Sequence, residues 1–269
     1  MVVFSNAKIN IGLNIISKRP DNYHNIETIF YPVELCDVIE ILPSETFKLS
    51  NYGHFIEGKT EENLCFKAFR LLKKLYSIPN VQIILNKNIP TGAGLGGGSS
   101  NAAFLLKALN EMFQINLTKE QLIKFSLQLG SDCPFFIYNK PLLATERGSS
   151  FKPVFLNLCD YYIVIVKDNI HISTSWAYSQ IKPQKPKYDI IKVIENEPID
   201  KWKNYLKNDF EEPIFKHYPT LKEIKNKLYN NGAIYASMTG SGSAIYAIYK
   251  QKPELYFSEK IFYWIGKLS

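Results

Sequence analysis

The sequence predicts an α+β protein, because strand and helix patterns occur in mixed runs and do not alternate strictly. Residues 7–16 alternate apolar and polar side chains, as in a strand with one buried face. After a strand expected at 81–85, two helices follow with no strand between them, which argues against a doubly wound sheet. The mixture recurs in the second half of the chain. The second half starts near residue 156, and the chain is long enough for one large domain or two small ones.

The other elements follow from apolar periodicity and from helix-capping patterns. Strands are expected at 26–33, 37–42, 142–146, 161–166, 233–238 and 244–249. Helices are expected at 62–76, 99–113 and 253–267. Two more helices are expected where capping boxes occur, one that pairs Thr118 with Gln121 and one that pairs Thr220 with Glu223. A turn rich in glycine and serine joins the last two strands.

Composition excludes several classes of protein. The 269 residues are 46% hydrophobic and carry a net charge of +7. No apolar run is as long as a membrane span, and the N-terminus resembles neither a signal peptide nor a transit peptide, so we expect a protein of the cytoplasm. The lysines are scattered and no arginine cluster is visible, which argues against a nucleic-acid partner. A basic surface could still attract anionic nucleotides.

The cysteines and histidines do not indicate a metal site or a disulfide framework. The four cysteines are widely spaced and form no CxxC pair, and the four histidines show no ligand spacing. Cys133, next to Asp132, is interpreted as a small buried residue, with a reactive thiol as the alternative. No residue is therefore assigned as a metal ligand.

The most informative segment runs from Pro90 to Ala103 and reads PTGAGLGGGSSNAA. Its glycines allow positive φ angles and bring bare N–H groups close to a ligand. The helix expected to follow adds the unpaired N–H groups and the positive dipole end of its N-terminus. A bound polyphosphate is favoured over a purely structural turn, because a linker would not lead directly into a buried helix.

Two common phosphate loops do not fit this segment. A Walker A loop needs Gly-Lys-Ser/Thr, whereas Gly97 is followed by Gly98. A formal GxGxxG is present at Gly92, Gly94 and Gly97. However, no strand leads directly into it and no strand follows its helix, so the dinucleotide-binding interpretation fails on context.

The segment instead resembles the phosphate loop of the GHMP kinases. Two further segments support this resemblance: residues 7–13 (AKINIGL) are similar to the family's N-terminal strand motif, and residues 238–244 (MTGSGSA) to its C-terminal glycine motif. The resemblance implies a two-domain fold, with an N-terminal domain at 1–155 like domain 2 of ribosomal protein S5 and a C-terminal ferredoxin-like domain at 156–269. It also implies ATP and Mg²⁺ as cofactors.

Within the family, residues 18–24 (KRPDNYH), the triple glycine and residues 129–136 (LGSDCPFF) resemble the members that act on a cytidyl diphosphate. Those members usually have glycine where this chain has Asn22, a residue that tolerates a left-handed turn. The resemblance implies phosphorylation of the 2-hydroxyl of 4-diphosphocytidyl-2-C-methyl-D-erythritol, on the non-mevalonate route to isoprenoid precursors.

Lys8 and Asp132 match the catalytic pair of these kinases. From periodicity alone, Lys8 would be an ordinary exposed strand lysine, and Asp132 could equally be a residue that caps a loop. The resemblance implies that Asp132 accepts or orients the hydroxyl proton and that Lys8 stabilises the developing negative charge. Asn10 lies two residues beyond Lys8 and is expected to point the same way, toward the substrate.

The resemblance also implies the residues that bind the two small molecules. Tyr23 would stack on cytosine and His24 would hydrogen-bond the edge of the base, with Tyr178 on the opposite face and Thr174 close by. The ATP site would comprise Asn63, Lys87, Pro90, Thr91, Gly92, Ala93, Gly94, Leu95, Gly96, Gly97, Gly98, Ser99 and Ser100.

Two alternatives remain open at this point. The chain could be another GHMP kinase, of the homoserine or mevalonate type, in which no aromatic sandwich is needed. It could also be a regulator that binds a nucleotide on the same fold without turnover. In either case we expect a monomer or weak homodimer that acts on or binds small molecules and has no nucleic-acid or membrane partner.

Overall fold

The computed structural model describes residues 1–268, which divide into two compact units. The first unit contains Met1–Ala7, Leu35–Thr91 and Gly96–Lys140. The second contains Lys8–Glu34, Gly92–Leu95 and the chain from Pro141 onward. The first two strands and the glycine loop therefore contribute residues to both units.

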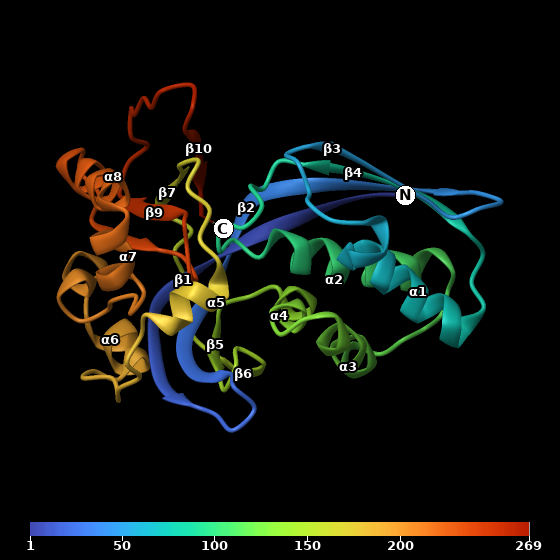
Figure 1. The fold of residues 1–269 in the computed structure, drawn as a ribbon, viewed down its shortest axis with the longest axis horizontal. Coiled ribbons are helices and arrows are strands. Elements are labelled where there is room, and N and C mark those ends of the chain that lie inside the picture. Colours follow the sequence, from blue (N-terminus) through green and yellow to red (C-terminus); the bar gives the residue numbers. More distant parts are fainter. Residues whose placement is uncertain (269) are drawn as a thin grey trace. The chain divides into compact units, whose positions relative to one another are not determined.

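The first unit is built on a sheet with helices on one side (Figure 1). Its strands come from β1 (Val2–Lys18), β2 (His24–Pro43), β3 (Lys48–Gly53) and β4 (Val81–Lys87). Strand β4 pairs parallel to β3 and antiparallel to β2. Alternate side chains of β4 are buried, as expected when one face of a strand lies against the core.

Four helices and a short 3₁₀ turn complete this unit. They are η1 (Thr60–Glu62), α1 (Leu64–Tyr76), α2 (Gly97–Met112), α3 (Lys119–Leu129) and α4 (Cys133–Tyr138). The capping box predicted between Thr118 and Gln121 is present at the start of α3. Helix α2 begins at Gly97, so it follows the glycine loop directly, as predicted.

The second unit contains an antiparallel sheet in the order β10-β7-β9-β8. Its strands are β7 (Tyr162–Lys167), β8 (Tyr235–Met238), β9 (Ile245–Tyr249) and β10 (Phe262–Lys267). Apolar side chains of α7 (Glu211–His217) and α8 (Pro219–Asn230) are buried with those of the sheet in one core. The remaining elements are β5 (Leu142–Thr145), β6 (Ser150–Pro153), α5 (Thr174–Ser179), α6 (Ile190–Asn196) and η2 (Ile199–Asn204).

Strand β5 pairs with β2 at Thr28–Phe30 and forms a hairpin with β6. The two strands predicted at 26–33 and 37–42 are in fact one continuous strand, β2. Strand β2 continues through Pro32 without a break. The predicted mixture of helices and strands is otherwise confirmed, and the fold is α+β.

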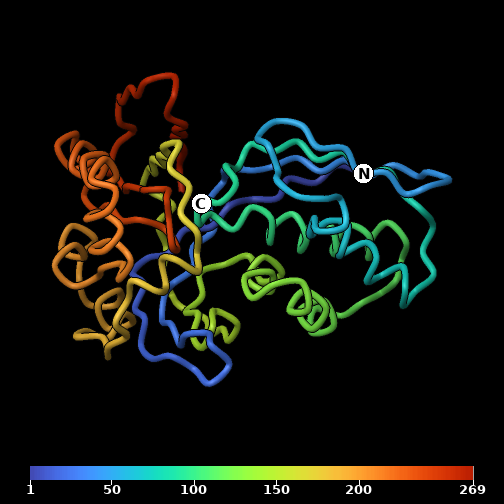
Figure 2. The backbone as a smooth tube through the Cα atoms, viewed as in Figure 1, coloured from blue at the N-terminus to red at the C-terminus, as the bar shows by residue number. Residues whose placement is uncertain are grey.

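Two local predictions are wrong. The helix expected at 253–267 is a loop (Figure 2) followed by β10, whose aromatic and β-branched residues favour pairing with β7. Thr220 does not cap α8, because Pro219 occupies the first turn and Tyr218 is the N-cap.

Within residues 1–268, none of the helices has the length and apolar character that crossing a bilayer requires. Among the described residues, Cys36, Cys65, Cys133 and Cys159 form no disulfide bond. Burial raises the pKa of the Cys133 thiol to about 12, so this cysteine is the buried residue that the sequence favoured and not a reactive thiol.

Candidate active site

Lys8 is buried, with 3% of its surface exposed, although it lies on a face of β1 that alternation assigned to solvent. Its ammonium group donates to Asn10 Oδ1 at 2.7 Å and to the carbonyl oxygen of Gly94 at 2.9 Å. The ring of Phe30 lies 4.7 Å from Nζ. The interpretation of Lys8 as an exposed strand residue is therefore wrong. Burying a charge is costly unless it is hydrogen-bonded, and these contacts hold Lys8 in place.

Asn10 points the same way as Lys8, as the strand period predicted. Its Nδ2 donates to the hydroxyl of Thr28 at 3.1 Å, and its backbone carbonyl accepts from the hydroxyl of Tyr246 at 2.8 Å. Its backbone N–H donates to the hydroxyl of Thr239 at 3.1 Å. Asn10 is thus fixed by both its side chain and its backbone.

The glycine loop has the backbone that an anion-binding turn requires. Gly92, Gly94 and Gly96 have φ angles of +60°, +77° and +74°. Gly96 is the N-cap of the 16-residue helix α2, and it has no side chain to satisfy the first N–H groups of that helix. These groups can therefore bind phosphate oxygens.

Gly94 and the C-terminal glycine turn pack backbone against backbone. A Cβ atom at Gly94 would collide with the carbonyl oxygen of Thr239, and one at Gly240 would lie 3.2 Å from the Gly94 Cα atom. In addition, the N–H of Ala244 donates to the carbonyl of Ala93 at 3.2 Å. The two glycine motifs of the sequence thus contact each other within the second unit.

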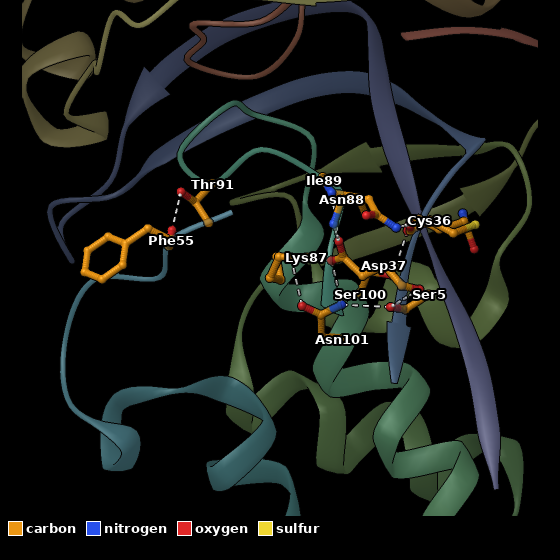
Figure 3. A network of polar contacts seen from close by, with 11 residues as sticks. Ser5, Cys36, Asp37, Phe55, Lys87, Asn88, Ile89, Thr91, Ser100 and Asn101 are labelled. Atoms are coloured by element: carbon orange, nitrogen blue, oxygen red, sulfur yellow. Dashed lines mark hydrogen bonds and ion pairs between the residues drawn. The ribbon is translucent and has the colours of Figure 1, made fainter. Parts of the chain in front are cut away.

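A buried polar network in the first unit holds the residues just before and just after the glycine loop (Figure 3). The carboxylate of Asp37, which is fully buried, accepts the N–H groups of Asn88 and Ile89, each at 2.8 Å. It also pairs with the ammonium of Lys87 and accepts from Asn101 Nδ2 at 2.8 Å. Asp37 therefore connects the end of β4, just before the loop, to the first turns of α2.

Three residues predicted to approach ATP have structural partners. Lys87 is 3% exposed, and it bonds to Asp37 and to Asn101 Oδ1, the latter at 3.0 Å. The side chain of Asn63 caps α1 by accepting the N–H of Cys65 at 2.8 Å. The hydroxyl of Ser100, which is labelled in Figure 3, is buried and donates to the carbonyl of Asn6 at 2.7 Å.

The other residues predicted for the loop have varied exposure. Pro90, Ala93, Leu95 and Gly97 are buried, whereas Thr91 is exposed and donates its hydroxyl proton to the carbonyl of Phe55 at 3.2 Å. Gly98 is exposed and Ser99 is half-buried. Ser99 and Gly98 are therefore the positions of the helix start that a ligand can reach.

Asp132 immediately precedes α4 and is half-buried. Its backbone carbonyl accepts from the N–H of Phe135 at 3.2 Å, which begins the helix. The residues that follow it, from Cys133 to Ile137, are all buried. The apolar helix thus fixes the backbone of Asp132 in the first unit, while Lys8 belongs to the second.

The predicted base-binding residues are partly brought together in the second unit. The His24 and Tyr178 rings are stacked, with centroids 4.7 Å apart and planes inclined by 16°. Burial, and to a lesser extent the charge of Lys18, lowers the pKa of His24 below its ordinary value of 6.5. Tyr23 is 55% exposed, and the guanidinium of Arg147 lies 5.4 Å from its ring.

Thr174 lies at the start of α5, and its hydroxyl is 3.2 Å from that of Ser241 in the C-terminal glycine turn. This contact joins the segment that carries Tyr178 to the turn that contacts Gly94. Asp37, Asn101 and Thr239 were not predicted as site residues. Thr239 lies inside the recognised C-terminal motif, which could have identified it, whereas nothing local distinguishes Asp37.

Comparison with known proteins identifies the family. The sequence profile of the GHMP kinases N terminal domain matches residues 63–140, and that of the GHMP kinases C terminal domain matches residues 190–256. A 4-diphosphocytidyl-2-C-methyl-D-erythritol kinase of Azobacteroides pseudotrichonymphae genomovar. CFP2 is 51% identical over 93% of this chain and 94% of its own length. The chain belongs to the GHMP kinase family. A protein of the same name from Bacteroides thetaiotaomicron is 47% identical and matches the full length of both chains.

Solved structures of GHMP kinases have the same fold. A 4-(cytidine 5'-diphospho)-2C-methyl-D-erythritol kinase superposes with a TM-score of 0.76 at 30% identity, over 92% of this chain and 89% of its own. The mevalonate kinase of Methanococcus jannaschii gives a TM-score of 0.71 at 15% identity, over 100% and 98%, which shows a shared fold alone. The predicted two-domain GHMP kinase fold is thereby confirmed. The boundary at residue 155 stays a prediction.

We predict that Asp37→Asn will destabilise the protein by about 3–5 kcal/mol, because it leaves the Lys87 ammonium buried without its counter-charge. Urea denaturation measures this loss. The double variant Asp37→Asn/Lys87→Met should recover part of it, because both charges are then absent. Equal stability of the wild type and Asp37→Asn would contradict the structural role of the pair.

Proposed function

We propose that this chain transfers the γ-phosphoryl group of ATP to the 2-hydroxyl of 4-diphosphocytidyl-2-C-methyl-D-erythritol. The observation that carries the proposal is the 51% identity, over 93% of the chain, to a kinase with this substrate in its name. The chain is accordingly a small-molecule kinase that uses ATP, and its product belongs to the non-mevalonate route to isoprenoid precursors.

The glycine loop is proposed to hold the phosphates of ATP. Its positive-φ glycines and the uncapped start of α2 present N–H groups without intervening side chains. Ser99, which is half-buried, is a better candidate than Ser100 for contact with a phosphate or with Mg²⁺, because the Ser100 hydroxyl is buried and bonded to Asn6. We propose that Lys87 and Asn63 support the site mainly by holding the helices and strand around it.

Magnesium is proposed as the cation that accompanies ATP. Within the described part of the chain, no group of three or more His, Cys, Asp or Glu side chains is arranged to hold a metal ion. Proteins commonly bind Mg²⁺ through few side chains together with the oxygens of substrate phosphates, and the half-buried Ser99 at the start of α2 is the contact proposed from this chain. When bound, the ion neutralises the charge that develops on the phosphates.

The chemistry assigned to this chain's residues is simple. The substrate oxygen forms a bond to the γ-phosphorus as the bond from that phosphorus to the ADP oxygen breaks. Asp132 is proposed to orient the hydroxyl and accept its proton, and the Lys8 ammonium to stabilise the oxygen as it becomes negative. Because hydrogen bonds to Asn10 and Gly94 fix Lys8 before substrate arrives, little reorganisation would be needed.

Base recognition is proposed to centre on Tyr23, which would stack on the cytosine, and on His24, whose ring stacks on Tyr178 and is held by it. A neutral imidazole has one donor and one acceptor nitrogen, so it can read the polar edge of a base. Stacking on an aromatic ring contributes roughly 1–3 kcal/mol per base. Asn10 and Thr174 are proposed as further substrate contacts, because each lies next to the C-terminal glycine turn.

The function is tested by measuring ADP release from purified protein with ATP and Mg²⁺. 4-Diphosphocytidyl-2-C-methyl-D-erythritol, mevalonate and homoserine are supplied separately. Turnover with the cytidyl substrate alone is expected. Turnover only with another alcohol would assign a different GHMP kinase activity, and ATP binding without turnover on any of the three would indicate a regulator. We also propose that the protein is cytoplasmic and that it is a monomer or weak homodimer. Sedimentation velocity on the same preparation tests the oligomeric state.

Gly94→Ala is predicted to weaken ATP binding at least tenfold, because the new methyl group would collide with the Thr239 carbonyl and displace the loop. Isothermal titration with a non-hydrolysable ATP analogue measures this effect. Gly232→Ala is the matched control, since Gly232 also has a positive φ, of +90°, but no atom lies within 4 Å of its added Cβ. The loop assignment is wrong if the two variants bind the analogue equally.

Asp132→Asn is predicted to lower kcat at least a thousandfold and to change the affinity for ATP by less than about threefold, because only the transfer step uses the carboxylate. Steady-state kinetics and analogue binding give the two values. Lys107→Met provides a control for disturbance near α4, since the Lys107 ammonium donates to the carbonyl of Phe136. Near-normal turnover of Asp132→Asn would remove this residue from the mechanism.

The pH dependence of KM for the cytidyl substrate tests His24. Its pKa lies below 6.5, so the ring is neutral at pH 7 and gains a proton only as the pH falls below 6.5. Protonation removes the acceptor nitrogen. We therefore expect a constant KM from pH 8 to about 7 and a rise below pH 6.5. His24→Asn should have a higher KM without this step, and persistence of the step in that variant would assign it to another group.

A further inference from the structure

Thr239 and Lys8 share the same two hydrogen-bond acceptors. The Thr239 hydroxyl lies 3.1 Å from both Asn10 Oδ1 and the Gly94 carbonyl oxygen, the two atoms that accept from the Lys8 ammonium. Thr239 is completely buried. The Lys8 ammonium and the Thr239 hydroxyl thus lie on opposite sides of the same two acceptor oxygens.

The hydroxyl also acts as an acceptor in this arrangement. The backbone N–H of Asn10 donates to it at 3.1 Å. A hydroxyl has one proton and two lone pairs, so Thr239 can hold the Asn10 backbone and either shared acceptor at once. The hydroxyl therefore holds the Asn10 backbone together with one of the two atoms, Asn10 Oδ1 or the Gly94 carbonyl oxygen, that accept from Lys8.

Thr239 is itself held by the C-terminal glycine turn. Its N–H donates to the carbonyl of Ala244 at 3.0 Å, and its carbonyl accepts from the N–H of Gly242 at 3.1 Å. The Asn208 amide donates to the carbonyls on either side of it, Met238 and Gly240, at 2.8 and 2.9 Å. The backbone that presents the hydroxyl is therefore constrained on both sides.

We infer that Thr239 is a positioning residue for phosphoryl transfer, acting through Asn10 and Gly94 to set the place of the Lys8 ammonium. This inference rests on the proposed function, since it assumes that Lys8 serves the transfer step. On this inference, the C-terminal glycine turn does more than pack against the loop. It places the Thr239 hydroxyl next to Asn10 Oδ1 and the Gly94 carbonyl oxygen, which accept from Lys8. A displacement of about 1 Å in a catalytic group can lower the rate by about a hundredfold.

The test compares Thr239→Val, which has nearly the same shape without the hydroxyl, with Thr239→Ser, which retains it. We expect Thr239→Val to lower kcat by about 10- to 100-fold while KM for the cytidyl substrate changes less than about threefold, and Thr239→Ser to stay within threefold of the wild type in kcat. Ser237→Ala is the matched control, because this buried hydroxyl lies two residues earlier, in β8, and bonds to Glu211. If Thr239→Val does not fold, Thr239→Ala replaces it.

A double-mutant cycle with Asn10→Ala tests whether Thr239 acts through Asn10. The loss of kcat in Thr239→Val/Asn10→Ala should be clearly smaller than the product of the two single losses. Independent losses, or equal kcat losses in Thr239→Val and Ser237→Ala, would overturn the inference.

Hydrogen exchange gives a readout that does not depend on turnover. The Asn10 amide should exchange faster in Thr239→Val than in the wild type or Thr239→Ser, because its acceptor is lost. An inactive wild type with this exchange pattern would refute the proposed function but support the hydrogen bond from the Asn10 amide to Thr239. An active wild type with unchanged exchange in Thr239→Val would refute the role of this hydrogen bond alone.

Discussion

The site depends on how the buried ammonium group of Lys8 is accommodated. A charge at 3% exposure must be hydrogen-bonded, and the acceptors are an asparagine on its own strand and a carbonyl of the glycine loop. The loop therefore has one observed task, since the carbonyl of Gly94 stabilises the lysine, and one proposed task, the binding of phosphate by its N–H groups. Gly94 needs a positive φ and a bare Cα atom for both, because Thr239 leaves no room for a Cβ.

The loop is also fixed at its ends by a different interaction. Asp37 binds two successive N–H groups just before Pro90 and reaches Asn101 on α2 after it. A carboxylate that accepts several N–H groups and an ammonium in a dry environment has little freedom to move. The segment just before the glycines and the helix just after them are thus held by the same carboxylate.

Much of this could be predicted from the sequence where the determinants are local. The glycine turn and the capping box at Thr118 depend on neighbouring residues and were predicted, and the start of α2 was predicted to within two residues. Strand β10 was mistaken for a helix because its partner, β7, lies about a hundred residues earlier. The burial of Lys8, the role of Asp37 and the contact of Thr239 with Asn10 likewise depend on residues distant in the sequence, which alternation and motif spacing do not report.

The most direct test of the account is a crystal structure with a non-hydrolysable ATP analogue, Mg²⁺ and 4-diphosphocytidyl-2-C-methyl-D-erythritol. It should place the triphosphate on the N–H groups of the glycine loop, and the 2-hydroxyl oxygen within hydrogen-bond distance of both Lys8 Nζ and the Asp132 carboxylate. Lys8 should keep its bonds to Asn10 and Gly94. A 2-hydroxyl bound out of reach of Lys8, or a triphosphate held elsewhere, would contradict the central claim.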